Sequence, residues 1–576
     1  MDSLVVIVLG VVLIVAVTAV GRRVNIAAPL VLVAIGLVLA ALPFVPNLPE
    51  IDPEWILMGV LPPLLYSAAV NVPAIEFRRD FTPIAGLSVL LVVISSLALG
   101  GFFTLVIPGL PFPVGVALGA ILSPTDAVAT GIVKRMGIAP RVVTLLEGES
   151  LLNDATALVL LRTATVAIAG GFSFGLAVGT FAWGVLLALV IGGVVGWLNL
   201  RVRRWVGNPA ANTALSFAVP FIAYLPTEQL GGSGLVAAVV AGIVTGQGAA
   251  RWFTPEQRLS ERLNWRTVEL LLEGGVFLIM GLELTDVVNR NFAEHGGLWH
   301  GIWLALSALG IVLVVRALYV TVVIWGQGRR ARRFTQEDLR RIGARVDAAE
   351  AAGSRPWGHA HRRGRRFEVV RRRLRRLSAD LDYYRDSPLG WKHGTLIVWA
   401  GMRGVVTLAA AQTLPTDTSH RALLVFTAFL VAVISLLLQG LTLPGVVRLL
   451  RFPDERHDDE DDDTPEETDR LRDELREAAT RALDAPGLAR RDGSPFDQGT
   501  LRRVRERFDR AWDAESAPDA EELIELRIAM IDVMRRRLVE LTSTGRYSTA
   551  SLRHSLADLD AEQLSLELKL ADDEGE

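Results

Sequence analysis

Apolar residues in this chain form long uninterrupted blocks rather than the short periodic stripes of a soluble protein. A block of about 17–25 apolar residues is long enough to cross the hydrocarbon core of a bilayer as a helix. The blocks cover residues 4–20, 26–42, 55–70, 83–107, 113–133, 143–169, 174–200, 211–227, 233–247, 267–284, 299–325, 391–414 and 420–447. The pattern predicts an all-α, polytopic membrane protein with thirteen transmembrane helices.

The basic residues between these blocks predict how the chain is oriented. Every second connection is rich in arginine, from Arg22 and Arg23 to the loop 328–390, while the alternate connections carry almost none. Because basic connections stay in the cytoplasm, we expect the N-terminus outside and the C-terminus inside the cell membrane. No basic segment precedes the first block, so we expect residues 1–20 to be a retained helix rather than a cleaved signal peptide.

Composition divides the chain into a membrane part and two polar appendages. We expect a transmembrane domain over 1–450, which contains the basic loop 328–390. An acidic linker over 451–464 then leads to a helical cytoplasmic domain over 465–576. The basic loop is either a solvated cytoplasmic helix or a contact for anionic lipid headgroups. Nothing in it supplies base recognition, so nucleic acid is not an expected partner.

The C-terminal domain reads as amphipathic helices, over about 465–484, 498–514, 519–541 and 549–572. Its third helix has one apolar face. That face consists of Leu523, Ile524, Ile528, Met530, Ile531, Met534 and Leu538. A dimerisation or regulatory role and a passive appendage are both compatible with this pattern. The chain has no cysteine, which excludes disulfides, thiolate metal sites and a cysteine nucleophile, and no cofactor is expected.

Charged and amide groups within the sixth block are the first candidates for function. Glu149 and Asn153 are four residues apart and share one helical face, and Asp154 lies about 100° further round. An ionisable group within the bilayer is costly and therefore indicates a functional site. One acid can hold a structural partner while Asp154 faces a water-filled cavity and receives a cation or a proton.

Two other blocks contain helix breakers near their middle. In the fifth block, Pro124 removes a backbone donor and disfavours helix before it, so we expect a break there, with Asp126 either capping the next half-helix or lining an ion site. In the twelfth block, Gly401 and Gly404 flank an intramembrane arginine, Arg403. Paired interruptions in the two halves of a transporter indicate inverted repeats, with the ion site where the broken helices meet.

The remaining charges of the membrane blocks need partners. Arg316 lies well inside the eleventh block, and an unpaired buried charge there would be very unfavourable. We expect it to pair with Glu149. Glu273 reads as a further buried acid, either lining the pore or pairing with a basic residue. Pro62 and Pro63 predict another proline break in the third block.

These residues together resemble the monovalent cation/proton antiporters of the NhaP and NHE branch. The resemblance rests on Gly-Glu-Ser-Leu-Leu-Asn-Asp at 148–154, Pro-Thr-Asp at 124–126, the arginine of the eleventh block and Gly-Met-Arg-Gly at 401–404, which occur in the family's order. It covers about residues 1–450 and leaves the basic loop and the C-terminal domain outside. It implies an NhaA-like fold, in which a core domain with crossed fifth and twelfth helices moves against a dimerisation domain of a homodimer.

The resemblance also implies roles for particular residues. Asp154 would carry the cation, expected to be Na⁺, and the proton, and Asn153 and Ser150 would support it. Thr125 and Asp126 would contribute from the broken helix, so that Asp154, Asp126, Thr125 and Ser150 form the Na⁺ ligand set. Glu149 would pair with Arg316, and Arg403 would compensate charge at the crossing. An Asn-Asp pair is associated with electroneutral exchange. One departure is that Ser67 stands where many relatives carry an acid, which removes one potential ligand.

The expected activity is thus transport and not an enzymatic reaction: a monovalent cation is exchanged for H⁺ because both compete for Asp154. K⁺ in place of Na⁺ is the nearest alternative, and a cation channel would differ by lacking coupling to protons. A membrane sensor that has lost transport and signals through its C-terminal domain is a second alternative. Intramembrane aspartyl hydrolysis by Asp126 and Asp154 is disfavoured by the adjacent Asn153 and by the absence of a Gly-x-Gly-Asp motif.

Overall fold

The structure is a computed structural model. It describes residues 2–24, 27–42, 53–170, 174–295, 298–333, 383–384, 388–415, 418–452, 465–483, 488–490, 492–507, 520–542 and 544–573. The described elements are helices, with one isolated bridge between Ala489 and Pro495. Most of the predicted basic loop 328–390 and of the acidic linker 451–464 lies outside these residues.

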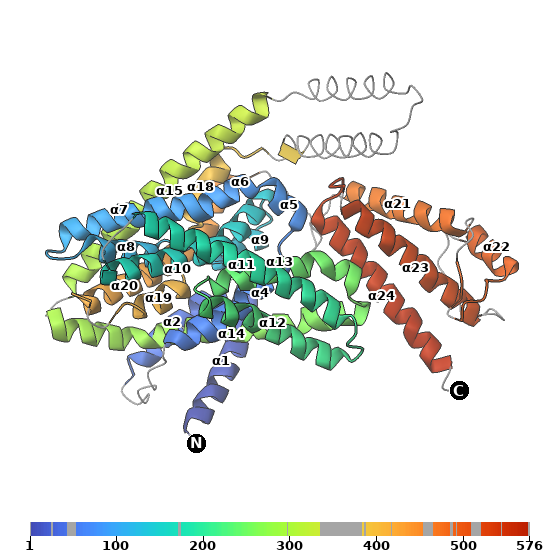
Figure 1. Ribbon diagram of the computed structural model, residues 1–576, viewed down its shortest axis with the longest axis horizontal. Coiled ribbons are helices and arrows are strands. Elements are labelled where there is room, and N and C mark those ends of the chain that lie inside the picture. The colour runs from blue at the N-terminus through green and yellow to red at the C-terminus, as the bar shows by residue number, and fades with distance from the viewer. Residues whose placement is uncertain are drawn as a thin grey trace.

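Helices lie at each of the thirteen apolar blocks (Figure 1). They are α1 (Asp2–Val24), α2 (Ala28–Ala40), α3 (Pro53–Trp55), η1 (Ile56–Val60), α4 (Leu61–Val70), α5 (Ala74–Arg79), α6 (Phe81–Ala85), η2 (Gly86–Leu90), α7 (Leu91–Val106), α8 (Phe112–Leu122), α9 (Val128–Arg135), α10 (Pro140–Gly170), α11 (Phe174–Arg203), α12 (Pro209–Gln229), α13 (Gly234–Trp252), α14 (Pro255–His295), α15 (Trp299–Arg333), α18 (Trp391–Trp399), α19 (Val405–Gln412) and α20 (Arg421–Leu450). The C-terminal domain contains α21 (Pro465–Leu483), α22 (Gln498–Arg507), α23 (Ala520–Thr542) and α24 (Thr549–Asp573).

By length and hydropathy, six of the described helices can each cross a membrane: Phe81–Val106, Pro140–Ile168, Val178–Arg203, Gly234–Trp252, Trp299–Arg329 and Arg421–Leu450. Shorter apolar helices accompany them at Val5–Gly21, Ala28–Ala40, Ile56–Val70 and Phe112–Leu122. The fold is therefore an all-helical one with several membrane-crossing helices. The count of thirteen crossings stays a prediction.

Local sequence explains where several helices begin. Asn208 accepts hydrogen bonds from the backbone N–H groups of Ala210 and Ala211, and Pro209 occupies the first turn, so that α12 starts with its orphan donors satisfied. The third block differs from expectation, because Pro62 and Pro63 do not interrupt the helix. They lie in the first turn of α4, where the missing N–H groups of proline cost least. The π-helical turn η1 directly precedes them and changes the local hydrogen-bond pattern, so that the helix continues.

The membrane helices pack as two groups. We call α1, α2, α4, α11, α12, α13 and α14 the first group, because these helices pack chiefly on one another. The second group consists of α7, α8, α9, α10, α15, α18, α19 and α20. The groups meet where α10 touches α4, α11 and α13, and where α14 touches α19 and α20. The short helix α5 lies on the chain segment that leads from α4 in the first group to α7 in the second.

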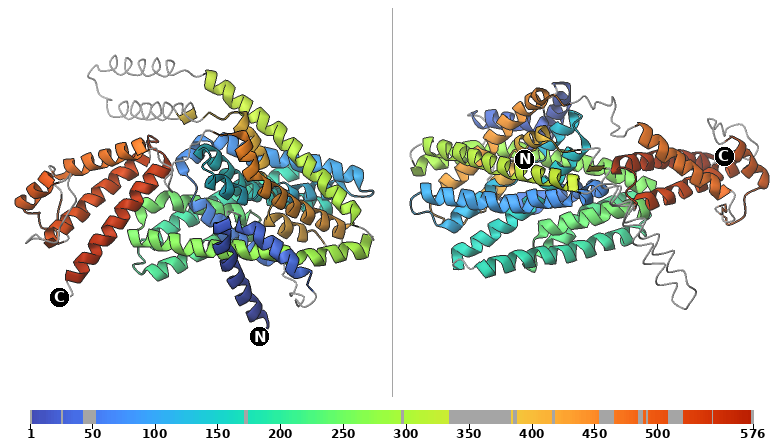
Figure 2. Two further views of the ribbon diagram at one scale, coloured as in Figure 1. Left: turned by 180° about the vertical axis from the view of Figure 1, so that it is seen from behind. Right: turned by 90° about the horizontal axis from the view of Figure 1, so that it is seen from above.

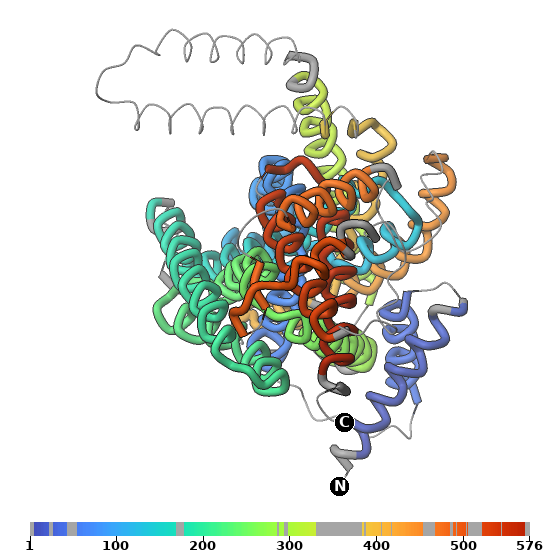
Figure 3. Tube along the Cα trace, turned by 90° about the vertical axis from the view of Figure 1, so that its right-hand side faces the viewer, coloured from blue at the N-terminus to red at the C-terminus, as the bar shows by residue number. Residues whose placement is uncertain are grey.

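Helices α21–α24 lie beyond one end of the membrane helices, as the views in Figures 1 and 2 agree. They enclose their own apolar core, which contains Leu471, Leu475, Met530, Ile531 and Met534. Seen from that end, they cover the middle of the molecule (Figure 3). We call α21–α24 the tail.

Candidate functional site

The two interrupted helices touch at their breaks. Helix α8 ends at Leu122 and α9 begins at Val128, while α18 ends at Trp399 and α19 begins at Val405. Between them, the backbone N–H of Asp126 donates to the carbonyl of Met402 at 2.7 Å. A non-helical backbone is tolerated in a membrane protein only where its polar groups find partners or line a cavity, and here each break supplies a partner to the other.

Arg403 lies at this crossing and is 1% exposed. Its Nε donates to the carbonyl of Leu122 at 3.0 Å, its Nη1 donates to the carbonyl of Gly401, and its backbone N–H donates to Ser435 Oγ at 2.7 Å. The carbonyl end of a helix carries partial negative charge, so the guanidinium neutralises the end of α8. Charge compensation by Arg403 during ion exchange, which the resemblance implied, stays a prediction.

Asp126 stands at the other side of the crossing. Its Oδ1 accepts a hydrogen bond at 2.8 Å from the N–H of Val128, at the start of α9, a contact that fits the capping alternative and leaves Oδ2 on the side of the second break. A Cβ added to Gly404 would lie 1.4 Å from Asp126 Oδ2. Glycine is thus the residue type that lets the second break approach this carboxylate.

Helix α10 brings three of the candidate residues onto Thr125. Ser150 Oγ donates to the Thr125 carbonyl at 3.0 Å, and Asn153 Nδ2 donates to Thr125 Oγ1 at 2.6 Å. Thr125 Oγ1 in turn donates to Glu149 Oε1 at 3.4 Å. Asn153 Oδ1 is buried and has no hydrogen-bond partner among the described residues. The break in the fifth block is therefore held on α10 through its own threonine.

Glu149 and Arg316 form a buried ion pair. Arg316 Nη2 donates to Glu149 Oε2 at 2.8 Å, and Nη1 donates to the other carboxylate oxygen. Arg316 also donates through Nε to the carbonyl of Ile397, near the end of α18, at 3.0 Å. Both side chains are almost fully buried, so each charge depends on the other. The pair joins α10, α15 and α18 next to the crossing.

Asp154 differs from every other acid at the site. It is 8% exposed, and no described residue donates a hydrogen bond to it. Its carboxylate interacts with that of Asp126, which adds repulsion between like charges. A buried carboxylate without donors and beside a second carboxylate is unfavourable unless it takes up a cation or a proton. Among the described acids, this arrangement makes Asp154 the group most in need of a positively charged ligand.

Glu273 corrects one expectation and leads to a residue that sequence reasoning missed. The side chain was expected to be buried, yet it is exposed on α14 and interacts with Asp126 and with Glu269 one turn earlier. Glu269 accepts a hydrogen bond from Ser67 Oγ, which belongs to α4. A carboxylate therefore does lie beside Ser67, but it comes from another helix. The pair Glu269 and Glu273, at helical spacing within a membrane block, was the signal that could have revealed it.

Known proteins resemble this chain both in sequence and in fold. The family model for the sodium/hydrogen exchanger, transmembrane, matches residues 9–449. This chain belongs to the sodium/hydrogen exchanger family. The antiporter is 30% identical over 462 residues to an uncharacterised Na⁺/H⁺ exchanger of Mycobacterium tuberculosis, an alignment that covers 79% of this chain and 76% of that protein.

Two further relatives extend the comparison. The Na⁺/H⁺ antiporter ApNhaP of Aphanothece halophytica is 27% identical over 441 residues, which cover 74% of this chain and 70% of the relative. The solved structure of the sodium proton antiporter MjNhaP1 from Methanocaldococcus jannaschii superposes with a TM-score of 0.56 at 16% identity. It covers 78% of this chain and 99% of that one, and at this identity it shows the fold alone.

The family resemblance that the motifs predicted is therefore confirmed. The chain is a multi-pass, all-helical membrane protein and a monovalent cation/proton antiporter. It belongs to a family of transporters and not of enzymes, so the aspartyl hydrolase alternative is set aside.

We expect Gly404→Ala to disturb the crossing, because the added methyl group would overlap Asp126 Oδ2. Overpacking of this kind costs about 1–3 kcal/mol. The antiporter variant should melt at a lower temperature in detergent and exchange ions more slowly. Gly131→Ala on α9 is the matched control, since a Cβ there meets nothing within 4 Å. Equal behaviour of the two variants would contradict the close approach at Gly404.

We expect Arg316→Ala to harm assembly of the antiporter, because it leaves Glu149 buried without its partner. Removal of one member of a buried pair costs about 3–5 kcal/mol. The yield of monodisperse protein, measured by fluorescence size-exclusion chromatography, should fall sharply. The double variant Glu149→Gln with Arg316→Met should recover part of this yield, because it removes both charges. A normal yield for Arg316→Ala alone would show that the pair does not stabilise the fold.

Proposed function

We propose that the antiporter exchanges Na⁺ for H⁺ across the cytoplasmic membrane, and that Asp154 is the group for which the two ions compete. The observation that carries the proposal is the buried carboxylate of Asp154, without a donor and next to Asp126. The names of the M. tuberculosis and A. halophytica relatives support sodium as the cation.

The ligands proposed for the cation are oxygen atoms around the break in the fifth block. Sodium is a hard cation that prefers such ligands. Asp154 and Asp126 would supply carboxylates, and Thr125 and Ser150 would supply hydroxyl or carbonyl oxygens. Asn153 would support the set through its bond to Thr125.

The balance of charge around the site supports electroneutral exchange. Arg316 and Arg403 are two cations, and Glu149 interacts with both of them. Among these three groups and the ionised Asp126 and Asp154, one negative charge remains uncompensated, and one Na⁺ or one H⁺ would neutralise it. Only loaded states would then cross the apolar barrier, because an ionised carboxylate there is unfavourable. This condition produces obligatory exchange of one ion for the other.

The two helix groups support a mechanism of alternating access. We propose that the second group, which holds the crossing and Asp154, moves against the first group, through which the antiporter forms a homodimer. We further propose thirteen crossings, with the N-terminus outside and the C-terminal domain inside. The basic residues near the tail support this orientation. Arg79 and Arg258 contact the tail, and the carbonyl of Arg203 accepts from Gln257, next to Arg258. Basic residues therefore gather at the end of the membrane helices that the tail contacts, as expected for the cytoplasmic side.

We expect Asp154→Asn to abolish exchange while the protein still folds, because the amide cannot release a proton or balance a cation. Proteoliposomes with a trapped pH dye would be pulsed with Na⁺, K⁺ or Li⁺. A cation-triggered pH change should occur in wild type and should disappear in the variant. Asp473→Asn, on the exposed surface of α21, is the control and should exchange normally. Robust exchange by Asp154→Asn would overturn the assignment, and a stronger response to K⁺ than to Na⁺ would make the antiporter a K⁺/H⁺ exchanger.

We expect Glu273→Gln to raise the sodium concentration for half-maximal exchange by about tenfold, because Glu269 and Glu273 concentrate cations near Asp126. The effect should shrink as ionic strength rises, since salt screens exposed charges. Exchange rates would be measured against sodium concentration at two ionic strengths. Glu256→Gln, on the exposed start of α14, is the control. An unchanged half-maximal concentration at low ionic strength would exclude this role.

A further inference from the structure

The tail contacts the one short segment that leads from α4 to α6. This connector consists of residues 71–80 and contains α5. It runs from the end of α4, in the first helix group, towards α7, in the second group, so relative movement of the groups must act on it. Its contacts with the tail are the basis of the inference.

The connector inserts an apolar side chain into the tail. Ile75, on α5, is 3% exposed and belongs to an apolar core whose other buried members all lie within residues 471–570 of the C-terminal domain. Separation of the tail from the connector would expose this side chain and open the tail's core to water. Docking is therefore favoured by the hydrophobic effect as well as by polar contacts.

The neighbouring acid on α5 caps the helix that docks. Glu76 accepts a hydrogen bond at 2.9 Å from the N–H of Thr549, the first residue of α24, and another at 2.5 Å from its hydroxyl. A carboxylate at the N-terminus of a helix satisfies orphan N–H groups and complements the positive end of the helix dipole. Within the tail, Ser548 Oγ accepts from the N–H of Ser551, so Glu76 adds a second cap to α24 from the membrane domain.

An arginine of the tail makes the reciprocal contact. Arg553, one turn further along α24, donates to the carbonyl of Asn71 at 2.8 Å and to that of Val72 at 3.1 Å. These carbonyls end α4, and a cation there complements the negative end of its dipole. Arg79, at the far end of α5, donates to the carbonyl of Gly545 in the turn before α24 at 2.6 Å. The tail therefore holds both ends of the connector.

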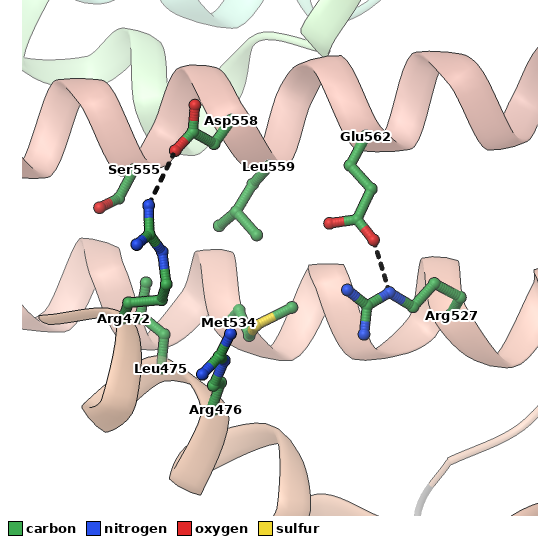
Figure 4. Close-up of a pocket in the computed structure, with 9 residues that line it drawn as sticks. All are labelled: Arg472, Leu475, Arg476, Arg527, Met534, Ser555, Asp558, Leu559 and Glu562. Atoms are coloured by element: carbon green, nitrogen blue, oxygen red, sulfur yellow. Dashed lines mark hydrogen bonds and ion pairs between the residues drawn. The ribbon is translucent and has the colours of Figure 1, made fainter. Parts of the chain in front are cut away.

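The tail is itself fixed to the first helix group. Arg258, near the start of α14, donates through Nε to Asp560 Oδ2 at 2.7 Å, and Arg535 of α23 binds the same carboxylate at 3.2 Å. Figure 4 shows how α24 is joined to the rest of the tail around a cavity of about 200 Å³. There, Arg527 pairs with Glu562 at 2.6 Å (Figure 4). Because the tail helices are joined to one another, the tail links α14 to the connector as one body.

The distal end of the connector is fixed to the second group. Arg141 of α10 pairs with Asp80 at 3.0 Å, and both side chains are buried. Tyr383 donates to the same carboxylate at 3.1 Å, and Tyr384 donates to the carbonyl of Arg79 at 2.5 Å. The described piece of the basic loop therefore docks next to the tail. Both cytoplasmic appendages meet on the connector.

We propose that the docked tail is a brake on ion exchange: it holds the connector between the two helix groups and slows their relative movement. This inference rests on the proposed function, because it assumes that exchange requires that movement. The cation site itself lies at the crossing and makes none of these contacts. Release of the tail should therefore change the rate of exchange and not the affinity for the cation.

The test compares full-length antiporters in proteoliposomes. Glu76→Gln and Arg553→Ala should each raise the maximal rate of sodium-driven proton movement about fivefold or more, the lower range of allosteric coupling. The sodium concentration for half-maximal exchange should stay unchanged. Arg481→Ala is the control, since this exposed residue of α21 pairs within its own helix. Hydrogen exchange of residues 71–79 should become faster in Glu76→Gln and Arg553→Ala, which would report undocking of the tail, and should not change in the control.

A crosslink gives the converse measurement. The chain contains no cysteine, so a thiol-specific crosslinker would react only with cysteines that are introduced. With Glu76→Cys and Thr549→Cys combined, a short bismaleimide should lock the tail and lower the exchange rate below that of the untreated protein. Unchanged or lower rates in variants that hydrogen exchange shows to be undocked would overturn the brake. Full exchange after complete crosslinking would do the same. If neither the wild type nor Glu76→Gln nor Arg553→Ala exchanges any of the cations, the proposed function fails, and the brake fails with it.

Discussion

The backbone hydrogen bond between Asp126 and Met402 is the contact on which the crossing of the two interrupted helices depends. Each of these residues lies in a gap between half-helices, where backbone groups lack their usual helical partners. Such groups cannot be left to the hydrocarbon, so the two gaps can exist only because they face each other. The approach is close enough that Gly404 leaves no space for a side chain beside Asp126. The crossing thereby fixes the position of the acid that is neighbour to Asp154.

The charges around the crossing are satisfied in different ways, and this difference creates the site. Arg403 is bound to carbonyls at the end of α8, and Arg316 is bound to Glu149. Asp126 is occupied by the N-terminus of α9. Asp154 alone among these groups lacks a described donor, although it is almost as deeply buried. Since Arg403, Arg316 and Asp126 already have protein partners, the ion that we propose for Asp154 would come from outside the protein.

Much of this arrangement follows from sequence because the responsible residues violate ordinary helix rules. Pro124 and the pair Gly401 and Gly404 marked the two breaks, and a lone arginine in an apolar block had to find an acid, as Arg316 does. The apolar face from Leu523 to Leu538, which periodicity alone predicted, is also confirmed, because its side chains lie in the tail's core. These features depend on local patterns or on a strong energetic penalty with few solutions.

Contacts that depend on tertiary placement were not predictable. Nothing local to Ser67 indicates that Glu269 on another helix would supply it with a carboxylate, and the exposure of Glu273 depends on how α14 faces its neighbours. Pro62 and Pro63 were misjudged because a preceding π-helical turn removes their cost. The tail shows the same limit more strongly. Glu76 and Thr549 are separated by most of the chain, and neither breaks a local rule, so only the fold reveals them as a pair.

The position of the tail has a physical consequence for how ion exchange can be controlled. A ligand or a domain that acted on Asp154 directly would alter affinity for the cation as well as rate. The tail instead acts where α4 ends, through Arg553 on its carbonyls and Glu76 on the next helix. These contacts add no charge to the ion site and complete no ligand set. A contact of this kind can change how often the two helix groups move, while the competition between cation and proton that we propose at Asp154 is left unaltered.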